Sequence, residues 1–68
     1  MNITVNGRTR VVDVGNTPSV ARVIEALGLQ GKRIAVERNG EIVSRSRYED
    51  TFLAEGDQLE IVGAVGGG

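Results

Sequence analysis

Apolar and polar residues alternate at the start of the chain. Met1, Ile3 and Val5 would face one way, because successive side chains of a strand point to opposite faces of its sheet. Asn6-Gly7 follows directly, and this dipeptide is the strongest short-range signal for a two-residue hairpin turn. A second strand is expected over residues 9–14. Its irregular alternation does not show which face is buried.

The hydrophobic spacing then changes to that of a helix. Four apolar residues stand at i, i+3, i+4 and i+7: Val20, Val23, Ile24 and Leu27. This stripe predicts a helix over residues 18–27 that packs against the sheet as core. Thr17 is the expected N-cap, and Pro18 suits the first helical position, where its missing N–H has no partner to lose. Gly28 suits the left-handed position after the last turn, with Leu29 as the accompanying apolar contact.

Three further strands are expected over residues 34–38, 41–43 and 58–65, and Asn39-Gly40 predicts a second hairpin turn between the first two. Phe52 and Leu53, in the long connection before the last strand, are expected to fill the core. The strand order therefore predicts an α+β protein. It is the β-grasp (ubiquitin-like) arrangement, a mixed sheet of four to five strands with one main helix packed on one face.

One domain is expected over residues 1–65, followed by a flexible glycine tail over residues 66–68. A single short helix covers only one face of a sheet. In the last strand Leu59 and Ile61 would point inward, whereas Val62 and Ala64 would point to solvent. A small exposed apolar patch beside a tail indicates a docking surface.

Composition excludes several classes of function. The chain has no Cys and no His, which excludes disulfides, the usual zinc sites and Cys-His or Ser-His-Asp catalysis. Eight basic and nine acidic residues give a net charge of -1, which argues against nucleic acid as a main partner. No segment has transmembrane length and no signal peptide opens the sequence. We therefore expect a soluble cytoplasmic domain with no membrane partner.

Two local features leave alternatives open. Arg45 and Arg47 would either contact an anion or form a solvated face, and the second interpretation is favoured. The final Gly66-Gly67-Gly68 would be either a frayed terminus or a segment without side chains that threads a narrow channel in another protein. In the second case the carboxylate of Gly68 would be presented to chemistry there.

Four stretches together resemble the ThiS family, the sulfur carrier proteins of the thiamine pathway: Asn2–Gly7, Val36–Val43, Gly56–Val62 and Val65–Gly68. The resemblance covers essentially the whole chain. Its most specific parts are the Gly-Asp-x-x-Glu-Ile-Val strand and the terminal glycines. Arg45 and Tyr48 also stand where similar sequences carry an arginine and an aromatic residue.

The resemblance implies a carrier rather than an enzyme, with no catalytic residue, no metal and no bound cofactor. An E1-like adenylating enzyme (ThiF-type) would activate the carboxylate of Gly68 with ATP and Mg²⁺. A sulfur donor system would then convert it to a thiocarboxylate, and the sulfur would pass to a thiazole synthase (ThiG-type). Gly66 and Gly67 would thread into the partner, and the partner-binding residues would be Val62, Ala64 and Val65.

Two other functions compete with this one. A molybdopterin-type carrier resembling MoaD shares the fold and a terminal Gly-Gly but is usually longer. An interaction module of ubiquitin-like fold with an inert tail belongs to a different class of protein altogether.

Overall fold

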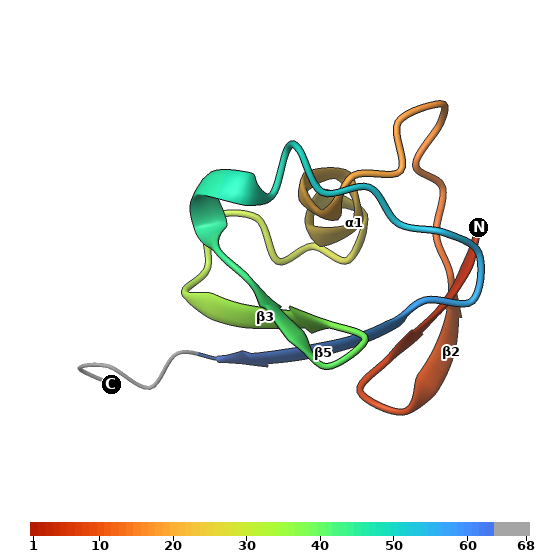
Figure 1. Ribbon diagram of the computed structural model, residues 1–68. Coiled ribbons are helices and arrows are strands. Elements are labelled where there is room, and N and C mark those ends of the chain that lie inside the picture. The colour runs from red at the N-terminus through yellow and green to blue at the C-terminus, as the bar shows by residue number, and fades with distance from the viewer. Residues whose placement is uncertain (64–68) are drawn as a thin grey trace.

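The computed structural model describes residues 1–63, which form one mixed sheet covered by a helix (Figure 1). The strands are β1 (Asn2–Val5), β2 (Arg8–Val11), β3 (Ile34–Arg38), β4 (Glu41–Val43) and β5 (Gln58–Gly63). The helix α1 (Val20–Ala26) lies over one face of the sheet, and a short 3₁₀ turn, η1 (Arg45–Arg47), follows β4. The predicted boundary at residue 65 lies outside the described residues.

The strand order is β2-β1-β5-β3-β4. β1 and β5 pair in parallel, and the other neighbouring strands pair antiparallel. β2 and β3 consequently run in the same direction on either side of the central pair, and α1 lies in the connection between them. This is the predicted β-grasp fold, with five strands and one helix on one face among the described residues.

Both predicted hairpin turns are confirmed. Asn6 and Gly7 have φ values of 51° and 83°, and Asn39 and Gly40 have 50° and 88°. A type I′ turn requires positive φ at both central positions, which Asn and Gly tolerate best. The first hairpin returns through a strand shorter than predicted. β2 ends at Val11, whose side chain is exposed, whereas Val12 beyond it is buried.

The helix begins two residues later than the sequence pattern predicts. Ser19, not Thr17, is the N-cap, and its Oγ accepts a hydrogen bond from the Arg22 N–H at 3.2 Å. Pro18 therefore precedes the cap instead of opening the helix. The reason is tertiary: Ser19 forms an isolated antiparallel bridge with Phe52, which keeps the chain extended up to the cap (φ -80°, ψ 159°).

The C-terminal end of the helix agrees with the prediction. Gly28 has a φ of 74°, and two backbone hydrogen bonds close a Schellman motif. The N–H of Gly28 donates to the carbonyl of Glu25 at 3.0 Å, and the N–H of Leu29 donates to that of Ile24 at 3.0 Å. Leu29 also packs against the core, as expected.

The core is aliphatic and lies between α1 and the sheet. Its buried members are Ile3, Val5, Val12, Val14, Val20, Val23, Ile24, Val36, Val43, Leu53, Leu59 and Ile61. Three of the four stripe residues of α1 belong to it, and Leu27 at the helix end is only partly buried. The stripe was therefore correctly predicted as core.

Phe52 is a correction to the sequence-based expectation. Leu53 is 5% exposed and belongs to the core, but Phe52 is 54% exposed. The N–H of Leu53 donates to the carbonyl of Pro18 at 2.7 Å, and the N–H of Val20 donates to that of Thr51 at 2.9 Å. These bonds hold the segment extended, so neighbouring side chains point to opposite sides and only one of the pair enters the core. Within residues 1–63, no helix combines the length and apolarity needed to cross a membrane.

Candidate functional site

β5 leads directly into the segment that the sequence analysis singled out. It is a central strand, flanked by β1 and β3, and Gly63 is its last described residue. The predicted reacting residue Gly68, the predicted threading residues Gly66 and Gly67, and the predicted contact residues Ala64 and Val65 all lie outside the described residues. The structure therefore defines the root of this segment and the surfaces around it.

The end of β5 is held by the turn residue Asn6. Its Nδ2 donates to the carbonyl of Ile61 at 2.9 Å, and the N–H of Ile61 donates to its Oδ1 at 2.7 Å. The amide side chain thus pairs with β5 as a backbone peptide group would, and it continues the parallel ladder past the end of β1. The root of the C-terminal segment is fixed two residues before Gly63.

The start of β5 is held in a similar way by the other hairpin. The N–H of Gln58 donates to Oδ1 of Asn39 at 3.0 Å, and the backbone N–H of Asn39 donates to the carbonyl of Gln58 at 2.8 Å. One asparagine at each hairpin therefore anchors one end of the strand. The sequence predicted both residues only as turn residues, because the second role depends on a distant strand.

Asp57 joins two segments just before β5, its own turn and the end of β3 with the turn that follows. Its Oδ2 accepts from the Ala54 N–H and from Nε of Arg38, both at 2.8 Å, and its Oδ1 accepts from Nδ2 of Asn39 at 3.1 Å. Partial burial acts to raise the pKa of Asp57. The hydrogen bonds from Ala54, Asn39 and Arg38 and the charge of Arg38 outweigh that effect and hold the pKa below its usual value. This network is structural, because it fixes the turn from which β5 departs.

The face of the sheet opposite α1 carries the predicted docking residue. Val62 is 57% exposed, which confirms its outward orientation. Its cross-strand partner is Ala35, and Ile42 on β4, 80% exposed, shares this face. We call Ala35, Ile42 and Val62 the open-face patch. Ile42 was not singled out from the sequence, although alternation with the buried Val43 would have placed it here.

The same face carries two opposed carboxylates. Glu37 and Glu60 are register partners on β3 and β5, and both are exposed. Like charges directly opposite each other destabilise a sheet. Ile42 is the register partner of Glu37, so it shares a row across the sheet with the two carboxylates, and Ala35 and Val62 form the next row.

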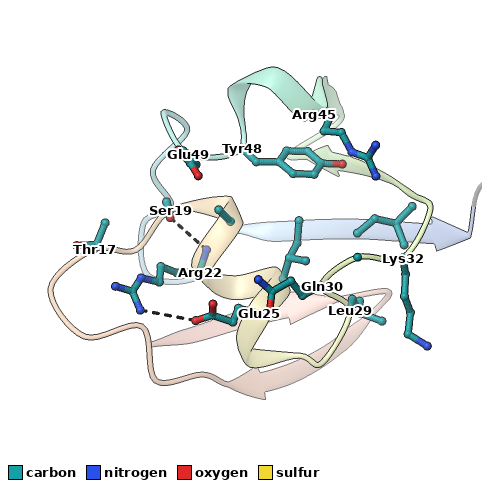
Figure 2. A pocket seen from close by; sticks show the side chains of 14 residues that line it. Thr17, Ser19, Arg22, Glu25, Leu29, Gln30, Lys32, Arg45, Tyr48 and Glu49 are labelled. Carbon is teal, nitrogen blue, oxygen red and sulfur yellow. Dashed lines mark hydrogen bonds and ion pairs between the residues drawn. The ribbon is translucent and has the colours of Figure 1, made fainter.

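A hollow of about 460 Å³ lies between α1, the segment 29–34 and the turn that contains Arg45 and Tyr48 (Figure 2). Arg22 and Glu25 form an ion pair at 3.7 Å on its helix side. Arg45 lines this hollow, whereas Arg47 lines a different one with Ile42. The two arginines therefore do not converge on one anion. Within the described part of the chain, no group of three His, Cys, Asp or Glu side chains is arranged to hold a metal ion.

The sheet order, the parallel central pair and the single covering helix define a ubiquitin-like β-grasp protein. Within that class the family model of the ThiS family matches residues 3–68. The chain belongs to the ThiS family.

Individual relatives agree with this assignment. The sulfur carrier protein ThiS of Bacillus subtilis is 38% identical over 53 residues, which cover 78% of this chain and 80% of that protein. The crystal structure of the thiamine biosynthesis protein ThiS from Geobacter metallireducens superposes with a TM-score of 0.82 at 36% identity, and the match covers all of both chains.

A thiazole synthase of Paramagnetospirillum magneticum is 40% identical over all 68 residues, and one of Magnetococcus marinus is 38% identical. The chain spans only about a fifth (20%) of the length of these two proteins.

Proposed function

We propose that this protein is the sulfur carrier of thiazole formation in thiamine biosynthesis, and that its sulfur is carried as a thiocarboxylate on Gly68. The observation that supports this most strongly is the match of the ThiS family model through to residue 68. The name of the Bacillus subtilis relative, a sulfur carrier protein, supports it further.

Adenylation is the step that the proposal requires first. A carboxylate is a poor acyl donor because it offers no good leaving group. An E1-like enzyme of the ThiF type would use ATP and Mg²⁺ to join the carboxylate to AMP and release pyrophosphate. A persulfide from the sulfur donor system then displaces AMP, and cleavage of the S–S bond by a second thiol leaves the thiocarboxylate.

The chain itself supplies the reacting carboxylate and its position, and no general acid or base. The anchored root at Ile61 and the turn at Asp57 orient β5, and the open-face patch offers an apolar surface for the partner. Ala64 and Val65 would extend that contact, and Gly66 and Gly67 would pass through a channel that admits backbone only. Holding a reacting group in place accounts for a large part of many rate enhancements.

A ThiG-type thiazole synthase is the proposed acceptor of the sulfur. The support is the match of the whole chain to a fifth of two proteins that are themselves thiazole synthases. A sulfur carrier must contact its acceptor in every reaction cycle. A carrier-like region within the same chain as a synthase would meet that synthase at high effective concentration. The proposed reactions, of which the adenylation consumes ATP, take place in the cytoplasm.

The test is ATP–pyrophosphate exchange with the adenylating enzyme. Intact mass first establishes that Gly68 is the last residue of the protein as purified. Deleting Gly67 and Gly68 should abolish exchange and leave the melting temperature unchanged, because the buried core found among the described residues ends at Ile61. Adding one residue after Gly68 should do the same, since it displaces the carboxylate by about 3.3–3.6 Å in an extended chain. Full exchange activity of the truncated protein would overturn the proposal.

A further inference from the structure

β5 extends beyond the end of β1, its parallel neighbour, near the root of the C-terminal segment. The pairing of β1 with β5 stops at Val5↔Leu59, and the Asn6 side chain takes the next position, at Ile61. Peptide groups alternate in direction along a strand, so the N–H of Gly63 points to the same side as that of Ile61. On that side the described neighbour of β5 is β1, with β2 beyond it, and the pairing of β1 with β5 has already ended before Gly63. The strand edge at Gly63 is therefore open.

A groove of about 390 Å³ lies beside this edge, lined by the end of α1, the segment that follows it and the end of β5. Leu27, Leu29 and Ile34 line it and are only partly buried. Their accessible surfaces give the groove an apolar floor. Gly63 lines it as well, so the groove adjoins the root of the C-terminal segment.

The charges around the groove are all of one sign. Arg10, Lys32 and Arg33 line it, and the described lining residues include no Asp or Glu. We call this feature the basic groove. Three of the eight basic residues gather here in a chain whose net charge is -1. Composition alone does not predict such a concentration of positive charge.

Two of these cations are available to a partner. Register pairs Arg10 with the buried Ile3, so the Arg10 side chain leaves the sheet on the helix side, toward the groove. Figure 2 shows Lys32 extending away from Arg45 and Tyr48. Both cations are exposed, and neither forms an ion pair with another residue in 1–63.

We propose that the basic groove docks an acidic segment of the adenylating enzyme, one with alternating apolar and carboxylate side chains. The apolar side chains would cover the floor, and the carboxylates would face Arg10 and Lys32. The backbone of the segment would pair with the open edge at Gly63, as in strand addition. The inference rests on the proposed function, because it assigns a second contact to the enzyme that activates Gly68.

Charge complementarity selects this occupant over an apolar one. A purely apolar segment would leave Arg10 and Lys32 without ion-pair partners, whereas carboxylates would pair with these two cations and speed the encounter. The groove is also distinct from the open-face patch, because it lies on the helix side of the sheet. An enzyme that binds both surfaces would contact the protein on both faces of the sheet near the root of the C-terminal segment.

Charge reversal tests the inference, with Arg10→Glu/Lys32→Glu as the test pair. The matched control is Arg22→Glu/Arg45→Glu, which changes the net charge by the same amount at exposed positions outside both the groove and the open-face patch. ATP–pyrophosphate exchange is measured as a function of carrier concentration. The test pair should raise KM for the carrier by about ten- to a hundredfold at low ionic strength and leave kcat at saturation unchanged. The control pair should stay close to wild type, and thermal melts should show that all variants fold.

Salt provides a second readout. The difference between test pair and wild type should shrink near 1 M salt, where the Debye length is about 3 Å. A KM rise that persists there would mean lost packing instead of lost charge pairing, and would overturn the inference. An unchanged KM of the test pair would also overturn the inference. An equal rise of KM in the test pair and the control pair would do the same.

Other occupants give different outcomes, each of which overturns the assignment. An unchanged KM in exchange with a raised KM in thiazole formation would place the contact on the synthase. Self-association of the wild type in sedimentation, lost in the test pair, would identify a second copy of this chain as the occupant. Failure of the wild type itself to support exchange would reject the proposed function, and is thereby distinguished from failure of the groove alone.

Discussion

At the scale of single residues, the chain relies on a few polar side chains that act as backbone or as turn anchors. Asn6 bonds the backbone N–H and carbonyl of Ile61, and Asp57 accepts hydrogen bonds from Arg38, Asn39 and Ala54. Each side chain links parts of the sequence that are distant from each other. Such residues stabilise the departure point of the C-terminal segment without belonging to the apolar core.

The Asp57 network predicts a defined loss of stability in acid. Because the native pKa of Asp57 is held below its usual value of 3.8, the unfolded chain takes up this proton first as pH falls. The stabilisation is complete above the unfolded pKa and is lost as pH drops through the native pKa. Asp57→Asn should therefore lower the free energy of unfolding at neutral pH by about 1.5–3 kcal/mol.

The difference between wild type and Asp57→Asn should shrink in acid below the usual carboxyl range, where both side chains are neutral. Urea denaturation at the two pH values measures it. A difference that stays constant with pH would show that packing, not charge, accounts for the loss.

At the scale of elements, the apolar stripe of α1 is buried unequally. Ile24 is 6% exposed, whereas Leu27 at the C-cap is only partly buried. Ile24→Ala should lower the free energy of unfolding by about 2–5 kcal/mol, and Leu27→Ala should lower it less, because less apolar surface and a smaller cavity are involved. Denaturant midpoints of the two variants give the order. The reverse order would mean that the helix end packs more tightly than its exposure indicates.

Two like-charged residues, Glu37 and Glu60, face each other on the open face of the sheet, and a single substitution should remove their repulsion. Glu37→Lys would face Glu60 with the opposite charge and should raise the free energy of unfolding by about 0.2–1 kcal/mol. Glu60→Lys should do the same, and the double variant should lose the gain because two like charges again face each other. The gain should also decrease at high salt. A double variant as stable as either single one would contradict the electrostatic explanation.

At the scale of the whole molecule, folding and partner binding use different faces of one sheet. The core side of β5 contributes Leu59 and Ile61, and the open side contributes Val62. Val62→Asp should therefore leave the thermal midpoint nearly unchanged and raise KM for the carrier in ATP–pyrophosphate exchange. The matched control is Val11→Asp on the edge strand β2, also exposed but outside the open-face patch. Equal effects of the two variants would contradict a docking role for the patch.

Features that depend on neighbouring residues could be predicted from the sequence alone. Asn-Gly at both hairpins, Gly28 after the helix and the helical spacing of Val20, Val23 and Ile24 were all interpreted correctly. In each case the cause is local, because backbone φ preference and side-chain period act over a few residues. The alternation that placed Val62 outward is of the same kind.

Features that depend on distant partners became visible only in the folded chain. The bridge between Ser19 and Phe52 moved the helix start and turned Phe52 outward, against the local signals of Thr17 and Pro18. Two further features join residues that are far apart in the chain. The Asn6 side chain forms hydrogen bonds with Ile61, and Arg10 and Lys32 line the same groove. Which distant backbone a segment meets is settled by the burial of the whole core. For that reason no local pattern along the sequence predicts it.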